Sequence, residues 1–415
     1  MSNMIAIALG PNYQSDDVAL SLRLLFQPWK WVRGNSVVEL EQAFAREMSL
    51  QNAVAFGTGR AALAACLSVR GISTGDEVLL QAFTCVAVPN AVRSVGAVPV
   101  FVDIDVSTYT MDPQALAARC TSKTRAIVVQ HTFGYPADMD AIMEFARARG
   151  LFVIEDCAHA MGSAYRGRPV GALGDVAVFS FGRDKPLSPV FGGMAVAQDS
   201  AFVEKLRHYR DERLSPAPAV WVAQQLLHAP LTAAAGVAHR WRTFGKVFLF
   251  LVKRLRLVAL AVAPEERRGR VARFGHYRMA NALAVLALWQ LQKIKSFSDH
   301  RRAIAGYYRQ MLAGTGAELP PPDGEERSVA WLRFPLRVRD PKRVMTIARA
   351  ANIYLGDWYR PVVAPSGVVL SAVGYREGSC PRAEHASEMA INLPTHQRVS
   401  ARDAARIISV ITPAL

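Results

Sequence analysis

Short apolar runs alternate with helical patterns along the first half of the chain. Between about residues 50 and 200, runs rich in Val, Ile and Phe read "NAVAFGTG", "DEVLLQAF", "AVPVFVDID", "TRAIVVQHTFG", "LFVIEDCAHAMG", "DVAVFSFG" and "GGMAVAQ". Between several of them lie stretches with helical periodicity, such as "RAALAACLSVRG" and "DMDAIMEFARARG". Because fully apolar strands that alternate with helices are typical of a buried, mostly parallel sheet, the pattern predicts an α/β fold.

The alternation of strand and helix patterns stops over residues 214–273. The segment is apolar, but prolines interrupt it and cations are spread along it. A transmembrane helix needs about 20 uninterrupted apolar residues, so the pattern does not predict one. The stretch "KVFLFLVKRLRLVALAV" leaves two interpretations open: a helix in the interface of an anionic membrane, or a helical excursion buried against a partner subunit.

The pattern predicts four parts of the chain. Residues 1–213 form a large domain, and residues 214–273 form the apolar, basic insertion. Residues 274–295 resume a soluble helical pattern, "YRMANALAVLALWQLQKIKSF", which links the domains. Residues 296–415 mix helix and strand signals, such as "SVAWLRFPLRV" and "ARDAARIISVI", and we interpret them as a smaller C-terminal α/β domain.

Composition and charge narrow the class of protein. The chain has 415 residues, of which 51% are hydrophobic and 20% charged, which is typical of a folded protein with a large core. The net charge of +15 would suggest a nucleic-acid partner, but ten Lys and Arg against two Glu fall within residues 240–273 alone. We see no nucleic-acid-binding motif and expect no nucleic-acid partner.

The cysteines indicate the compartment. All five are scattered and lack the CxxC spacing of a zinc site or a paired disulfide framework. They therefore predict a reducing compartment, the cytoplasm, and no metal centre. The first residues, "MSNMIAIALGPNYQSDD", lack the basic and long apolar regions of a secretory signal.

Polar residues at the strand ends carry the candidate chemistry. Asp156 closes the run "LFVIED", and Lys185 follows the next apolar run, which ends near Ser180. A buried lysine has a lowered pKa and attacks carbonyl groups, and a carboxylate can hold a pyridinium nitrogen protonated. Together they suggest pyridoxal 5'-phosphate (PLP). For Asp156 alone, a helix N-cap is the competing interpretation.

The phosphate of such a cofactor needs its own binding site. In "FGTGRAALAAC", a helix opens at Thr58, Gly59, Arg60 and Ala61. Free backbone N–H groups and the helix dipole favour an anion at such a position. Because glycines also serve ordinary turns, this motif gains weight only together with Asp156 and Lys185.

In these stretches the chain resembles the DegT/DnrJ/EryC1/StrS family, sugar aminotransferases of PLP fold type I. The resemblance rests on "VIEDCAHAMGSAYRGRPVGALGDVAVFSFGRDK", with "TGRAAL", "GGMAV", "YRMANALA" and "INLPTH" in the same order. It covers nearly the whole chain apart from residues 214–273. It implies a large PLP-binding domain with a mostly parallel seven-stranded sheet, followed by the smaller domain.

The resemblance implies a role for each site residue. Lys185 looks like the lysine that binds the cofactor covalently and carries the proton, and Asp156 looks like the partner of the pyridine nitrogen. His159 stands near the position of the cofactor's phenolic oxygen. Ser180 looks like a phosphate ligand, with Arg60 and Ala61 in the phosphate-binding loop.

Several positions depart from the family pattern. Cys85 stands where an aromatic residue often stacks on the pyridine ring, and Arg60 replaces a small hydroxyl residue. Arg60 is either a charge-assisted phosphate contact or a solvated helix residue. His131 lies near the family's active site, although a satisfied core histidine is the competing interpretation. The stretch that stands where a His-Tyr motif is common offers three candidate substrate contacts, Trp358, Tyr359 and Arg360.

The implied activity is amino transfer from an amino acid, glutamate in the family, to a keto sugar. A nucleotide-linked sugar for surface polysaccharide or a related glycan is expected, in a homodimer. Lys185 favours amino transfer, since relatives without this lysine dehydrate their substrate. Two alternatives stay open: a PLP enzyme acting on a lipid-linked or non-nucleotide acceptor, and a catalytically silent relative at the inner face of the membrane.

Overall fold

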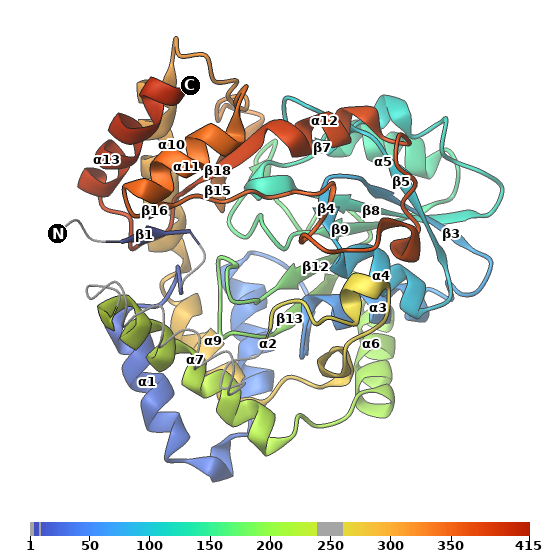
Figure 1. The fold of residues 1–415 in the computed structure, drawn as a ribbon. Helices are drawn as coiled ribbons and strands as arrows, with labels where there is room; N and C mark the ends of the chain where they lie inside the picture. Colours follow the sequence, from blue (N-terminus) through green and yellow to red (C-terminus); the bar gives the residue numbers. More distant parts are fainter. Residues whose placement is uncertain (1–3, 8–9, 239–259) are drawn as a thin grey trace.

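The computed structural model describes residues 4–7, 10–238 and 260–415 and is built around one large sheet (Figure 1). Its strand order is β2-β13-β12-β9-β8-β3-β5. Each of the seven apolar runs supplies one strand: β2 (Ala53–Phe56), β3 (Glu77–Gln81), β5 (Val98–Val102), β8 (Thr124–Gln130), β9 (Phe152–Asp156), β12 (Val176–Ser180) and β13 (Gly193–Ala197).

Strand direction brings the candidate site together. Strand β13 is antiparallel to both of its neighbours, β12 and β2, and the remaining pairs are parallel. The prediction of a mostly parallel seven-stranded sheet is therefore confirmed. Asp156, Ser180 and Phe56 are the last residues of their strands, and they lie at the same end of the sheet. Gly193, the first residue of β13, pairs with both Ser180 and Phe56 there.

Helices cover both faces of the sheet. Within β9, Val153 belongs to one buried cluster and its neighbour Ile154 to the other, as the two-residue period of a strand requires. One face packs against α2 (Ser36–Glu47), α5 (Met139–Arg147) and α9 (Asn281–Leu291), and the other against α3 (Gly59–Val69), α4 (Ala87–Ser94) and α6 (Ser200–Arg213).

Helix α7 (Ala219–Ala238) is the longest described element of the predicted insertion, whose residues 214–238 and 260–273 the structure describes. It packs against α1 (Ser15–Leu25) and α9, and buries Val222, Leu226 and Ala229 in the same core as the sheet. Most of "KVFLFLVKRLRLVALAV" falls within residues 239–259, outside the described residues, so the choice between membrane and partner subunit stays a prediction. Among the described residues, no helix has the length and apolarity to cross a membrane.

The C-terminal part has its own buried core. The antiparallel pair β15 (Arg333–Arg337) and β18 (Ala390–Pro394) packs with α10 (Ile294–Leu312), α11 (Pro341–Ala350) and α13 (Ala401–Ile411). The first strand, β1 (Ile5–Ala6), pairs with β16 (Ile353–Tyr354), and Ile5 is buried in this core. The chain thus starts in the smaller unit, whereas the sequence placed residues 1–213 in the large domain.

Short elements complete the described fold. They include β4 (Thr84–Cys85), β6 (Ile104–Asp105), β7 (Thr110–Met111), β10 (Ala164–Tyr165), β11 (Arg168–Pro169), β14 (Arg327–Ser328), β17 (Val363–Ala364), α12 (Pro381–Met389) and the 3-10 turns η1 (Pro28–Lys30), η2 (Pro113–Ala115), η3 (Thr132–Gly134), η4 (Glu266–Arg268), η5 (Arg273–His276), η6 (Leu370–Val373) and η7 (Thr412–Ala414).

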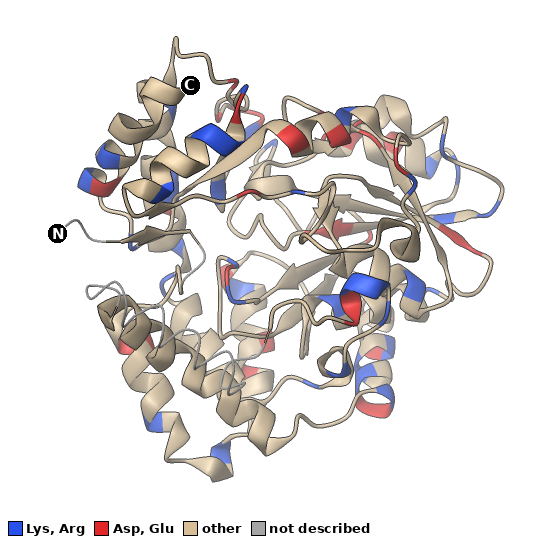
Figure 2. Cartoon of the chain, in the orientation of Figure 1, with Lys and Arg blue, Asp and Glu red and all other residues tan. Residues whose placement is uncertain are grey.

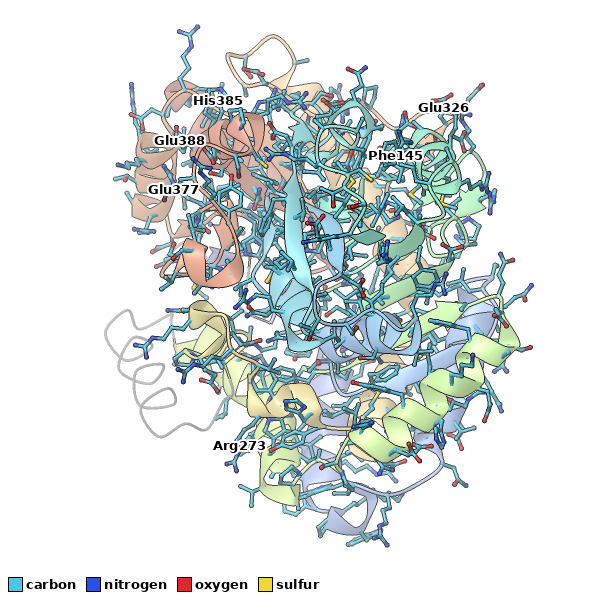
Figure 3. The ribbon with its side chains drawn as sticks, turned by 90° about the vertical axis from the view of Figure 1, so that its right-hand side faces the viewer. Phe145, Arg273, Glu326, Glu377, His385 and Glu388 are labelled. Atoms are coloured by element: carbon cyan, nitrogen blue, oxygen red, sulfur yellow. The ribbon has the colours of Figure 1, made fainter. Side chains whose placement is uncertain are left out.

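Helix α12 and the turn η5 lie at opposite sides of the molecule, as the labelled residues His385 and Glu388 of α12 and Arg273 of η5 show (Figure 3).

Candidate active site

A cavity of about 380 Å³ lies at the end of the sheet that holds the carboxyl ends of the parallel strands. Most of the predicted site residues line it together: Thr58, Gly59, Arg60, Cys85, Asp156, His159, Ser180, Lys185, Trp358 and Tyr359. They come from segments as far apart in the sequence as Thr58 and Tyr359, which the fold brings to one place. The sequence predictions thus converge on one site.

Lys185 lies in the loop that follows β12 and is half-buried. Its backbone N–H donates to the Gly182 carbonyl at 3.0 Å, and its carbonyl accepts a hydrogen bond from the Asn12 side-chain amide. The ammonium Nζ lies 4.9 Å from the centre of the Trp358 indole ring, a cation–π distance. The backbone of Lys185 is therefore fixed, while its amine faces the cavity beside an aromatic wall.

Asp156 ends β9 and is only 8% exposed. One carboxylate oxygen accepts from the Ala158 N–H at 3.0 Å. Burial raises the pKa of this carboxyl, while the positive charge of Lys185 acts in the opposite direction. The next regular element is strand β10, so Asp156 does not cap a helix. It is a buried carboxylate whose other side opens on the cavity.

The residues predicted to bind the phosphate lie where α3 meets the end of β12, and we call this place the Ser180 cradle. Thr58 caps α3, since its hydroxyl accepts from the Ala61 N–H at 3.1 Å. A Cβ on Gly59 would stand 2.9 Å from Cβ and 3.2 Å from Oγ of Ser180. Only a glycine lets this hydroxyl and the first turn of the helix converge, and both can bind an anion.

His159 is held in one tautomer. Its Nδ1 accepts from the Phe133 backbone N–H at 3.2 Å, so the neutral ring carries its proton on Nε2. Nε2 lies 3.0 Å from the Tyr359 hydroxyl oxygen and donates its proton to it. Burial, with the charges of Lys185 and Arg333, lowers the pKa of His159 well below its usual range. The ring is neutral at physiological pH.

These groups match the parts of PLP. The amine of Lys185 suits an aldehyde, the buried Asp156 suits a pyridinium nitrogen, and the Ser180 cradle suits a phosphate. Residues 14–226 and 251–412 match the DegT/DnrJ/EryC1/StrS aminotransferase family. The chain belongs to this family. The resemblance found in the sequence is therefore confirmed.

Relatives of this aminotransferase include two GDP-perosamine synthases. The protein from Caulobacter vibrioides is 29% identical over 100% of both chains, and that from Escherichia coli O157:H7 is 39% identical over 68% of this chain and 65% of the relative. Among solved structures, DesV of S. venezuelae, in complex with a ketimine intermediate, superposes with a TM-score of 0.74, at 27% identity over 96% of this chain and 94% of DesV. The predictions of a transaminase and of its PLP cofactor are confirmed.

Trp358 makes the outer wall of this site. Its ring lies parallel to that of His159, 5.3 Å away with an interplanar angle of 11°, and the Arg333 guanidinium carbon lies 3.4 Å from its centre. Arg333 also pairs with Asp184 at 3.1 Å. Sequence reasoning missed Arg333 and Asp184, because nothing in their local patterns indicates a contact across 149 positions.

The pairing of β4 with β17 brings this wall to Cys85. Residue Ala364 stands opposite Cys85 in a short parallel ladder, and the Val86 N–H donates to the Ala364 carbonyl at 2.7 Å. The segment that carries Trp358 and Tyr359 therefore lies against the strand where an aromatic residue was expected. Cys85 lines the cavity, and the aromatic surface comes from the C-terminal segment instead.

Arg60 was predicted to be either a phosphate contact or a solvated helix residue, but the structure gives it a different partner. Its guanidinium forms an ion pair with Glu266, donates to the Ala261 carbonyl at 2.9 Å and lies 5.1 Å from the Phe274 ring centre. Burial lowers its pKa to about 10. Arg60 is neither a solvated helix residue nor aimed at the Ser180 cradle, but joins α3 to the 260–276 segment.

The structure places three predicted residues outside the cavity lining: Ala61, His131 and Arg360. His131 is fully buried, its Nε2 lies 3.0 Å from Glu155 and its Nδ1 accepts from the Ala137 N–H at 3.1 Å. This is the position of a satisfied core histidine, and it does not support the substrate contact we predicted. Cys157 is also buried, and burial raises the pKa of its thiol well above its usual range.

We expect Gly59→Ala to raise the dissociation constant for PLP by roughly 10-fold or more, since the added methyl group would overlap the Ser180 side chain. Titration of the purified protein with PLP, followed by absorbance, measures this constant. The matched control is Gly306→Ala on α10, where a Cβ meets nothing within 4 Å. Equal PLP affinity in the two variants would contradict the cradle.

We expect His159→Gln to leave the shape of the pH–activity profile unchanged between pH 5 and 8. The pKa of His159 is lowered well below its usual range, so the ring takes up no proton in this window and contributes no limb to the profile. The glutamine amide keeps a donor toward Tyr359. A limb near pH 6.5 in the wild type that the variant lacks would show that His159 titrates.

Proposed function

We propose that this aminotransferase moves the amino group of glutamate to a nucleotide-linked keto sugar, for the biosynthesis of surface polysaccharide or a related glycan. One observation carries the proposal: Lys185, the buried Asp156 and the first turn of α3 share one cavity. The names of the two GDP-perosamine synthases support the nucleotide-linked acceptor.

The residues of the cavity divide the work. Bound PLP supplies an electron-withdrawing ring, which stabilises negative charge that develops on the substrate carbon. Asp156 would hold a proton at the cofactor's ring nitrogen through the charge of its buried carboxylate. Ser180 and the α3 amides would bind the phosphate, and the Trp358 ring lies beside the Lys185 amine, 4.9 Å from its Nζ. In the first half-reaction Lys185 Nζ would take a proton from the donor's α-carbon, and in the second it would deliver a proton to the sugar carbon.

Amination of defined acceptors tests this proposal. The PLP-loaded protein is incubated with isotopically labelled glutamate and a panel of GDP-, UDP- and TDP-linked keto sugars, beside the same sugars without the nucleotide. Mass spectrometry should find the label in a nucleotide-linked product. Label only in free or lipid-linked sugars would favour the alternative acceptors, and no labelled sugar at all would overturn the proposal.

We propose that the protein works as a homodimer in the cytoplasm. Large apolar side chains around α1 and η1 support a partner surface, since Phe26 is 80% exposed and Trp29 70% exposed. All five cysteines are unpaired, in keeping with a reducing compartment. Light scattering should give twice the chain mass of 45.4 kDa, and the monomer mass would contradict the dimer.

The proposed contact of residues 214–273 with an anionic membrane needs a separate test. We expect the purified protein to float with vesicles that contain anionic lipid and to lose this binding when residues 239–259 are deleted. The deletion spares α7, which packs in the core. No flotation, or flotation that the deletion leaves unchanged, would favour a partner subunit as the neighbour of this segment.

A further inference from the structure

The turn η4 forms part of the outer wall of the active-site cavity. Arg267, in this turn, is exposed to solvent and also lines the cavity, with Leu260 and Val262 just before it. Lys185 and Asp156 lie deeper, since the first is half-buried and the second only 8% exposed. Figure 2 shows the charges of this turn beside α4. Arg267 is thus a cation at the mouth of the site.

The turn is fixed from two sides. On one side, Glu266 pairs with Arg60 of α3, and its carbonyl accepts from the Asn90 side-chain amide of α4 at 2.8 Å. The Ala263 N–H donates to the same Glu266 carboxylate at 2.7 Å. Glu266 is only 1% exposed, so this contact is shielded from water. The Arg60–Glu266 pair therefore holds the turn on the helix that forms the phosphate cradle.

On the other side, the C-terminal segment supports Arg267 directly. The Arg267 carbonyl accepts from the Val369 N–H at 2.8 Å, and its guanidinium passes 3.5 Å from where a Cβ on Gly367 would stand. A Cβ on Gly269 would lie 2.3 Å from the Ala372 carbonyl oxygen, so the turn packs closely on η6. The Arg267 side chain thus passes beside Gly367, and Arg267 also lines the cavity.

Each of the other cationic side chains that line the cavity has a partner or a proposed role. Arg60 pairs with Glu266, Lys185 serves the cofactor, and Arg183 interacts electrostatically with Asp184. Within residues 4–7, 10–238 and 260–415, no acidic side chain forms an ion pair with Arg267. An exposed guanidinium at the mouth of a cavity, with no acidic partner among the described residues, suits a doubly charged anion, which it can bind through two parallel N–H···O bonds.

We propose that Arg267 binds the diphosphate of a nucleotide-linked sugar, and that the Arg60–Glu266 pair positions it. This inference rests on the proposed function, because it needs an acceptor whose sugar reaches Lys185 while its diphosphate stays at the mouth. Leu260 and Val262 offer an apolar surface beside the diphosphate. Arg267 is then a specificity-determining residue that separates nucleotide-linked from free sugars.

Binding of nucleoside diphosphates to the PLP-loaded protein tests the inference. Calorimetric titration with GDP, UDP and TDP should show binding of at least one of them to the wild type. Arg267→Met should weaken it by roughly 10- to 100-fold, the range for losing one charge-assisted pair. The matched control is Arg268→Met, since Arg268 is its exposed neighbour in the same turn and does not line the cavity.

A second set of variants tests whether the Arg60–Glu266 pair positions Arg267. Arg60→Met and Glu266→Met should each weaken nucleoside-diphosphate binding, and the double variant should be no weaker than the single ones, as for two residues that act through one contact. Affinity for PLP should stay within about twofold of the wild type in all three. A loss of PLP affinity confined to Arg60→Met would make Arg60 a phosphate ligand and overturn its positioning role.

The outcomes separate this inference from the proposed function. If Arg267→Met binds nucleoside diphosphates as well as Arg268→Met does, while the wild type still aminates a nucleotide-linked sugar, Arg267 is not the diphosphate ligand and the function stands. If the wild type binds none of the three nucleoside diphosphates, this inference is overturned. If it also aminates only free sugars, the proposed acceptor is overturned with it.

Discussion

Lys185→Ala is expected to lower kcat for amino transfer by roughly 10⁴-fold, the upper end of the effect of one positioned proton-transfer group. The reason is that the proposed mechanism gives this side chain two tasks, since its amine would bind the cofactor and would also carry the proton. The amine faces the cavity beside Trp358, while backbone contacts with Gly182 and Asn12 fix the loop. Alanine keeps the loop and removes both tasks.

Two measurements separate the tasks. Borohydride reduction of the PLP-loaded wild type should fix the cofactor on the peptide that contains Lys185, as mass spectrometry of a digest would show. Steady-state assays then compare Lys185→Ala with Lys185→Arg, which keeps the charge but not the nucleophile, and with Lys205→Ala, an exposed lysine on α6. Cofactor fixed to another lysine, or a Lys185→Ala variant with more than a tenth of wild-type kcat, would refute the assignment.

Asp156→Asn is expected to lower kcat by roughly 10²- to 10³-fold, as for the loss of one preorganised electrostatic contact. Asparagine has nearly the same shape, so the hydrogen bond from the Ala158 N–H can persist and PLP should still bind. What is lost is the buried negative charge, which in the proposed mechanism would keep a proton on the ring nitrogen. Without that proton, the ring withdraws electrons less strongly from the substrate carbon.

The control for this variant is Asp199→Asn, which changes a carboxylate that caps α6 through the Ala201 N–H, away from the cavity. Stopped-flow absorbance should show the slow step in the glutamate half-reaction of Asp156→Asn and a normal rate in the control. A variant that binds PLP and reacts with glutamate at the wild-type rate would mean that the charge of Asp156 does not drive the reaction.

The large sheet could be predicted because its signals are local. Each strand is a short run that is apolar on both faces, and the run length and flanking polar residues are visible in the sequence. That Asp156 and Lys185 lie close together could also be predicted, since neighbouring parallel strands have their carboxyl ends at the same end of the sheet. The antiparallel course of β13 could not be predicted this way, because strand direction depends on how its connection to β12 folds back.

The rest of the site depends on contacts between distant segments. The ladder that places Tyr359 beside His159 joins β4 to β17, nearly 280 residues apart, and neither strand is longer than two residues. Arg60 could be singled out as unusual, but its partner Glu266 lies 206 positions away in a cationic segment. His131 fits a core position as well as a catalytic one until its neighbours Glu155 and Ala137 are known.

The most direct test of the account is the absorption spectrum of the PLP-loaded protein, recorded before and after glutamate and again after a nucleotide-linked keto sugar. We predict a visible band from the lysine-bound cofactor, which glutamate removes and the keto sugar restores, and which Lys185→Ala lacks throughout. A cofactor band that glutamate leaves unchanged would contradict the donor assignment. A wild-type protein without any such band, even in excess PLP, would contradict the assignment of this cavity as a PLP aminotransferase site.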